Sequence, residues 1–498
     1  MGKERRRQLG IICSLFMYFL YVVLLMIRTK MLIAHYGSEV NAVFQTSNQI
    51  FAYFILFESG MSAAYQFKLY GPVNDKDGRR IASLFIGLKK SMKKIAVKMM
   101  VILVVVSLVY PFIMNRVSLS FFKTGLMLLL LGFRFIIPYA VSVASKTLLN
   151  VYDYKYIIDN IDSLGYMAIT FLEVFMMERV HCSVFDVLIA GCIGNILIGL
   201  VYTCVVRKLC DEACGKAAVP DYEPEEMTGD ILFHQVTGLL NSNIDTIILS
   251  IFNIMLVTPY HAYYSTMNYF SQVVNKINEN YRTKIGMKIK RHDRDLHSYF
   301  QMLMAFHMAA AIVSMAVFVL NINDFISLWI GKEFLLSNTC VILLALYLML
   351  RMTINIIFLV RDGAGLYKES KWFSFREGIV NLLLSVILVQ FWGIEGILFA
   401  TVFATYTMLV PGNAKLAYRR VMEKRNTLWG DYLVIVAVVV GLVWALNGRS
   451  GITGNLTWKF LLFRLIGQSL VSMMIAALIV GIVKWKYISP YFLKRRKL

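Results

Sequence analysis

Charged side chains interrupt the apolar stretches of this sequence at a few positions, and their types favour ion binding or ion pairing over catalysis. Arg134 and Arg351 lie near the middle of two long apolar stretches. Arg28 and Lys30 lie toward the end of a different stretch, the first apolar stretch of the chain. A guanidinium can donate two parallel hydrogen bonds to a carboxylate or to a phosphate. A charge within hydrocarbon costs at least about 2.5 kcal/mol unless it faces protein or water, so these cations are candidates for binding an anionic substrate in a polar interior.

Two carboxylates in the same stretches offer another reading of the arginines. Glu58 lies at a depth similar to that of Arg134, and Asp245 at a depth similar to that of Arg351. Each arginine could therefore neutralise a carboxylate, contact a ligand, or do both. A carboxylate in a low-dielectric site can also exchange protons, so Glu58 and Asp245 are alternatively candidates for ion coupling.

The remaining polar candidates are amides, and no catalytic or metal-binding pattern accompanies them. Asn241 and Asn243 lie in the same stretch as Asp245 and are predicted to contact substrate. The seven cysteines have no paired spacing, and Cys210 and Cys214 lack the neighbouring histidines of a zinc site. We therefore predict no catalytic residue, no metal and no cofactor.

The elements that must position these residues are membrane-spanning helices. Of the 498 residues, 58% are hydrophobic and 16% are charged, and the mean hydropathy is +0.64. Apolar stretches of about 20 residues, enough to cross a bilayer as a helix, recur often enough for about fourteen spans. The formal net charge of +21 lies mainly in short segments between the spans, which argues against nucleic acid as the partner.

The distribution of lysine and arginine predicts the topology. Basic clusters occupy every second connecting segment, whereas the alternate segments carry only scattered cations such as Arg116 and Lys332. Lysine and arginine gather on the cytoplasmic side of membrane proteins, so both termini are predicted to be cytoplasmic. An acidic, proline-containing segment at 208–230 is interpreted as a linker. It would separate a six-helix bundle at 1–207 from a second at 231–425, and 426–498 would add two further spans and a basic tail.

Several segments resemble the Wzx-type polysaccharide flippases of the multidrug/oligosaccharidyl-lipid/polysaccharide (MOP) exporter superfamily. They read IRTKMLIAHYG, ESGMSAAYQFKLYGP, NSNIDTIILSIF, INDFISLWIGKEFLLS, and REGIVNLLLSVILVQFWGIEG. The resemblance implies an all-α integral membrane fold similar to that of MATE exporters. Two pseudo-symmetric six-helix bundles would enclose a cavity that opens alternately to either side, and two C-terminal helices would follow.

The function that this resemblance implies is transport of a polyprenyl-pyrophosphate-linked oligosaccharide from the inner to the outer leaflet of the bacterial cytoplasmic membrane. Capsule, exopolysaccharide or wall-polymer synthesis would use the product, and the partners would include membrane lipids and the polymerase and glycosyltransferases of the pathway. The alternatives are a flippase for a lipid-linked peptidoglycan precursor and a MATE-like drug or cation exporter. A membrane glycosyltransferase or polymerase is disfavoured because the outer segments are short and poor in acid/base groups.

Overall fold

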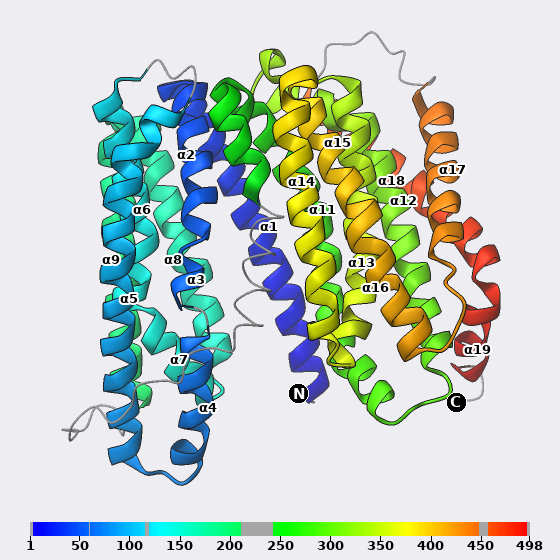
Figure 1. Cartoon of the computed structure of the whole chain (residues 1–498), viewed down its shortest axis with the longest axis horizontal. Coiled ribbons are helices and arrows are strands. Elements are labelled where there is room, and N and C mark those ends of the chain that lie inside the picture. The colour runs from blue at the N-terminus through cyan, green and yellow to red at the C-terminus, as the bar shows by residue number, and fades with distance from the viewer. Residues whose placement is uncertain (1–2, 59, 115–118, 211–242, 448–456, 496–498) are drawn as a thin grey trace. The chain divides into compact units, whose positions relative to one another are not determined.

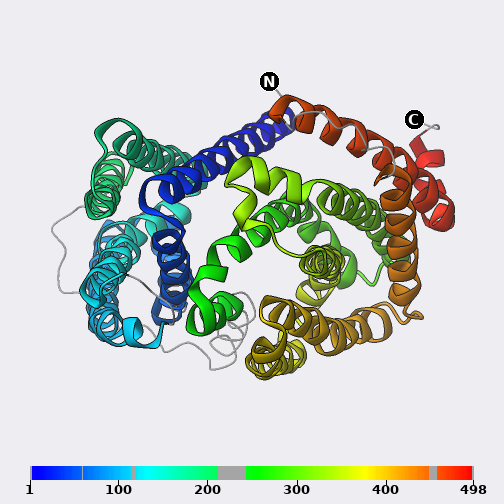
Figure 2. The same cartoon turned by 90° about the horizontal axis from the view of Figure 1, so that it is seen from above.

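The computed structural model describes residues 3–58, 60–114, 119–210, 243–447 and 457–495 (Figure 1). The described residues form helices and the turns between them. The helices divide into two compact units, and each is a bundle of helices that run side by side (Figure 2). Unit 1 comprises Met1–Leu239 and Leu249–Thr258, and unit 2 comprises Leu240–Ile248 and Pro259–Leu498. Most of the predicted linker at 208–230 lies outside the described residues.

Unit 1 contains the helices of the first six predicted spans. They are α1 (Lys3–Tyr36), α2 (Ser38–Ala52), α3 (Ile55–Glu58), α4 (Met61–Asn74), α5 (Gly78–Ile113), α6 (Phe121–Val141), α7 (Val143–Val151), α8 (Lys155–Phe175), the π-helical turn η1 (Met176–Val180) and α9 (Val184–Leu209).

The second predicted span of unit 1 is not one continuous helix. The chain leaves helical geometry after Ala52, forms the short α3, and resumes at α4 after Gly60. Gly60 has φ +77°, a left-handed conformation that side chains disfavour and that glycine adopts freely. The Glu58 carboxylate then accepts a hydrogen bond of 3.0 Å from the backbone N–H of Ser62, which stabilises the first turn of α4.

Unit 2 contains the later spans. The helix at 243–253 contributes its first residues to unit 2 and its last to unit 1. It is followed by η3 (Ile254–Leu256), α11 (Val257–Lys290), α12 (Leu296–Trp329), η4 (Lys332–Phe334), α13 (Asn338–Gly363), α14 (Tyr367–Trp392), α15 (Ile394–Ala404), η5 (Thr405–Leu409), α16 (Val410–Lys415), η6 (Leu416–Val421), α17 (Leu428–Asn447), α18 (Trp458–Val483) and α19 (Trp485–Arg495).

The candidate span Ile394–Val421 contains two π-helical turns, η5 and η6, on either side of α16. The Oγ1 of Thr405, at the start of η5, donates a 2.8 Å hydrogen bond to the buried carboxylate of Glu377 on α14. Single π turns inside α-helices often occur at functional sites because they redirect side chains and backbone groups. The irregular part of this span therefore lies beside a buried acid.

Two polar clusters, one of them buried, attach the C-terminal helices to α12. Near the start of α12, Lys484 Nζ lies 2.6 Å from Asp431 Oδ1 and donates a 2.7 Å hydrogen bond to Gln301. Near its other end, Arg464 of α18 forms an ion pair with Asp324 and donates to Asn321. Since α12 and α18 meet through both of their ends, these clusters fix the antiparallel register of the two helices.

Eleven helices among the described residues are long and apolar enough to cross a membrane. This finding confirms the all-α membrane fold, although the number differs from the fourteen predicted spans. The broken second span and α8 fall outside the eleven, and α8 carries Lys155, Asp159, Asp162 and Glu173. The seventh and eighth predicted spans join in one apolar stretch, Asn243–Asn275.

Candidate functional site

A cluster of one buried and two partly buried charges lies in unit 1, between α1, α6 and α8. The Glu173 carboxylate of α8 is 1% exposed and contacts both Arg28 of α1 and Arg134 of α6. Arg28 Nε lies 2.7 Å from Glu173 Oε2, although its N–H is not aligned for a hydrogen bond. Arg134 Nη1 donates a short hydrogen bond to Oε1. One carboxylate therefore neutralises only one of the two guanidinium charges.

Neighbouring residues shape the space around this cluster. Gly191 of α9 lies so close that an added Cβ would meet Arg134 Nη1 and Glu173 Oε1, each at 2.8 Å. Asn195, one turn later on α9, donates to the backbone carbonyl of Arg134 at 3.4 Å. The Arg28 guanidinium lies over the ring of Phe44, 4.3 Å from its centroid, a geometry that stabilises a cation.

Pairing with Glu58, one of the alternatives that the sequence leaves open for Arg134, is not found in the structure. Glu58 accepts a backbone hydrogen bond at the start of α4, and the partner of Arg134 is Glu173. Similar depth along two apolar stretches did not identify the pair, because the packing of α6 against its neighbours decides which carboxylate faces the arginine. Lys30, predicted beside Arg28 as a substrate ligand, has an exposed side chain outside this cluster.

A second buried cluster, in unit 2, is organised around Asp245. Its carboxylate is 5% exposed and accepts hydrogen bonds from Thr401 of α15 at 2.8 Å, Tyr260 of α11 at 3.1 Å and Asn381 of α14 at 3.2 Å. Asn381 also accepts hydrogen bonds from Ser385 and Thr401 through its Oδ1. Neutral donors thus surround this carboxylate.

Pairing with Asp245, the corresponding alternative for Arg351, is not found either. Among the residues that the structure describes, no carboxylate lies within 4.0 Å of the Arg351 guanidinium, and Glu377 attracts it only over a longer distance. The guanidinium carbon lies 6.0 Å from the centroid of the Tyr347 ring, one turn earlier on α13. Arg351 is partly exposed. Its hydrogen-bond donors are therefore not occupied by a close acid.

Of the two asparagines predicted to contact substrate, the structure describes only Asn243. Asn243 is buried at the start of the helix at 243–253, with a 7% exposed side chain. Asn241 lies outside the described residues.

Sequence reasoning missed Glu173, Glu377, Asn381 and Thr401. Both glutamates lie inside apolar stretches, ITFLEVFMM and REGIVNLLLSV, so the cost of a charge in hydrocarbon could have identified them as it identified Glu58. Asn381 and Thr401 carry no comparable signal, because neutral polar side chains are common in membrane helices and often bond within their own helix.

The two clusters suit different chemistry. The unit 1 cluster keeps an excess positive charge in a largely apolar bundle, as an anion-binding site requires. The unit 2 cluster holds a carboxylate beside amide and hydroxyl oxygens, which are ligands of hard cations. No group of three or more His, Cys, Asp or Glu side chains that could hold a metal ion occurs in the part of the chain that the structure describes.

Comparisons with known proteins identify the fold. No family model matches this sequence, and no match was found among curated proteins. A solved structure of the lipid II flippase MurJ, in an inward closed conformation, is similar with a TM-score of 0.65 and 15% identity, and covers 94% of this chain and 99% of that one. An inward-facing multidrug resistance MATE family transporter of the MOP superfamily is similar with a TM-score of 0.58 and 10% identity, over 83% of this chain and 94% of that one. This chain therefore has the all-α membrane fold that these two transporters share.

Proposed function

We propose that the protein is a membrane transporter that moves a polyprenyl-pyrophosphate-linked oligosaccharide from the inner to the outer leaflet of the bacterial cytoplasmic membrane. Its product would supply capsule, exopolysaccharide or wall-polymer synthesis, as in the Wzx-type flippases that the sequence resembles. The fold supports a transporter, since both similar structures belong to transporters. Both termini would be cytoplasmic, and the polymerase and glycosyltransferases of the pathway would be its partners.

The observation that carries this proposal is the excess of partly buried guanidinium groups over close carboxylates. Arg28 and Arg134 share Glu173, and Arg351 has no acid within 4.0 Å among the described residues. A pyrophosphate offers several oxygens to bidentate donors, and a partly desolvated guanidinium binds such a group strongly. The arginines would therefore hold the anionic part of the substrate while its chain stays in lipid.

Asp245 is proposed as the ion-coupling residue of the transporter. It is buried and bonded only to neutral donors, so uptake of a proton or a cation would not have to break an ion pair. Glu58, the other candidate for coupling, instead stabilises the first turn of α4.

Two other substrates fit the same fold. A lipid-linked peptidoglycan precursor also carries a pyrophosphate, and the MurJ structure is named as a lipid II flippase, so the arginines suit this substrate equally well. A cationic drug, as a MATE exporter would carry, is disfavoured because it would meet the uncompensated arginines. The anionic head therefore defines the substrate class, and the attached sugar separates the two pathways.

Translocation by the full chain in proteoliposomes tests the proposal. We expect a fluorescent polyprenyl-pyrophosphoryl saccharide to change leaflets with wild type, more slowly with Arg351→Lys, and at background rate with Arg351→Met. Lysine keeps the charge but loses the two-pronged donor geometry. Lys332→Met removes an exposed cation outside both clusters and serves as the matched control. Transport of an organic cation without movement of the labelled lipid would overturn the proposal.

A further inference from the structure

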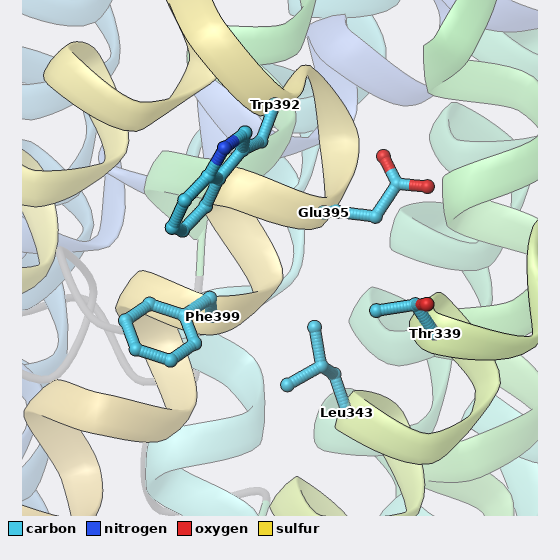
Figure 3. A pocket seen from close by; sticks show the side chains of 5 residues that line it. All are labelled: Thr339, Leu343, Trp392, Glu395 and Phe399. Carbon is cyan, nitrogen blue, oxygen red and sulfur yellow. The ribbon is translucent and has the colours of Figure 1, made fainter.

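An open pocket of about 440 Å³ lies where one end of α13 meets the junction of α14 and α15 in unit 2 (Figure 3). Leu343 of α13, Trp392 of α14 and Phe399 of α15 form its apolar wall, and Thr339 and Glu395 provide the polar groups. The volume greatly exceeds the about 30 Å³ of one water molecule, and the wall offers few groups to bond ordered water. The pocket therefore suits a hydrocarbon chain.

The pocket is continuous with a row of exposed aromatic side chains. Trp392 is 56% exposed, and Phe399 and Phe403 are each 41% exposed. Their rings follow one another from the end of α14 along α15, and the ring centroids are 6.0 Å apart between Trp392 and Phe399 and 6.0 Å apart between Phe399 and Phe403. All three belong to candidate spans, where exposed large apolar side chains contact lipid. A chain in the pocket can thus continue into the surrounding bilayer along this row.

The polar part of the pocket carries one negative charge at the junction of α14 and α15. Glu395 lies in the first turn of α15, next to the turn at Gly393 that ends α14, and Trp392 lies at the same junction. Tryptophan is enriched at membrane interfaces, so this junction is expected to reach the headgroups. The Glu395 carboxylate accepts a 2.8 Å hydrogen bond from Ser337 Oγ, which holds it in place.

We propose that this pocket binds one acyl chain of a phospholipid whose headgroup carries a primary amine, such as phosphatidylethanolamine. The carboxylate attracts the ammonium group and repels a headgroup that carries only phosphate. A polyprenyl pyrophosphate is disfavoured at this pocket for the same reason. The proposed site is separate from Arg28, Arg134 and Arg351 and does not depend on the proposed function.

Native mass spectrometry of the purified full chain with defined lipids tests this site. Wild type is expected to retain phosphatidylethanolamine in preference to phosphatidylglycerol of the same chains and to polyprenyl phosphate. Glu395→Gln keeps an oxygen that can accept the Ser337 hydrogen bond but removes the charge. It should reduce the preference for the amine headgroup by about two- to fivefold, as for one exposed ion pair. Leu343→Trp fills the pocket and should remove one bound lipid per chain.

Two control variants separate the pocket from its surroundings. Glu333→Gln removes an exposed carboxylate between α12 and α13, and Phe391→Ala removes a 76% exposed ring of α14; neither residue lines the pocket. Both should bind lipid as wild type does. The proposal is overturned if Leu343→Trp retains the full lipid complement, if Glu395→Gln keeps the headgroup preference, or if polyprenyl phosphate competes equally with phosphatidylethanolamine in wild type.

Discussion

In unit 1 one carboxylate serves two arginines, whereas in unit 2 two carboxylates accept hydrogen bonds from hydroxyl and amide groups. Glu173 contacts Arg28 and Arg134. Asp245 accepts hydrogen bonds from three neutral side chains, and Glu377 from Thr405. The negative charge of Glu173 therefore helps to stabilise unit 1. In unit 2, Asp245 stabilises the packing through the hydrogen bonds that its carboxylate oxygens accept, which do not require a charged partner.

This difference also separates two functional roles. A carboxylate locked between two guanidinium groups is poorly placed to exchange ions, because each exchange would expose a buried positive charge. A carboxylate with neutral donors can change its charge at lower cost. We therefore expect unit 1 to provide permanent positive charge for substrate, and Asp245 to provide the charge that varies during transport.

The largest expected effect follows removal of the Glu173 charge. Glu173→Gln leaves two arginines in one buried cluster without a counter-charge, and breaking a buried pair in this way costs about 3–5 kcal/mol. The free energy of unfolding, measured in mixed micelles by detergent titration, should fall by this amount. Combining Glu173→Gln with Arg134→Gln should recover part of the loss, since one uncompensated charge is removed. A Glu173→Gln variant as stable as wild type would show that the charge of Glu173 does not stabilise unit 1.

Gly191→Ala should have the next largest effect. The new methyl group would meet both Arg134 Nη1 and Glu173 Oε1 at 2.8 Å, so the ion pair must shift. Crowding of this kind typically costs about 1–3 kcal/mol. Gly441→Ala in α17 is the matched control, because no heavy atom lies within 4 Å of the added Cβ. Equal melting temperatures for the two variants would show that the pair has room to move.

Asp245→Asn should cost less than Glu173→Gln, although both changes neutralise a buried carboxylate. The asparagine oxygen can still accept from Thr401 and Tyr260, and no cation is left behind, so we expect a loss of about 1 kcal/mol. In proteoliposomes the variant should nevertheless lose the dependence of transport on an ion gradient. Retained ion dependence would instead remove Asp245 from the coupling role.

The smallest effect is expected for Glu58→Gln. The amide oxygen can accept the same hydrogen bond from the Ser62 N–H, and no ion pair with Arg134 exists to be lost. The free energy of unfolding should change by no more than about 0.5 kcal/mol, so the melting temperature of the purified protein should stay close to that of wild type. A loss comparable to that of Glu173→Gln would restore Glu58 as a partner of the arginine cluster.

The fold was accessible from the sequence because the length and polarity of an apolar stretch depend on local composition alone. The pairing of charges was not, because it depends on how helices distant in sequence face one another. Two glutamates in the sequence, Glu58 and Glu173, lie at depths where either could pair with Arg134. The choice follows from the approach of α9 at Gly191 and Asn195, which no local pattern reveals. The neutral donors around Asp245 could not be predicted either, because they come from helices that are distant in sequence.

Binding of polyprenyl pyrophosphate to the Arg28→Met variant tests whether the excess positive charge of unit 1 binds the substrate. This change leaves Arg134 to neutralise Glu173, so the fold should persist while the excess positive charge of unit 1 disappears. Titration of the full chain in nanodiscs should show affinity for the pyrophosphate lower by about tenfold or more, as for a lost charge-assisted hydrogen bond, and unchanged weak binding of the uncharged polyprenol. Equal affinity of wild type and a folded Arg28→Met variant for the pyrophosphate would show that this charge does not bind the substrate.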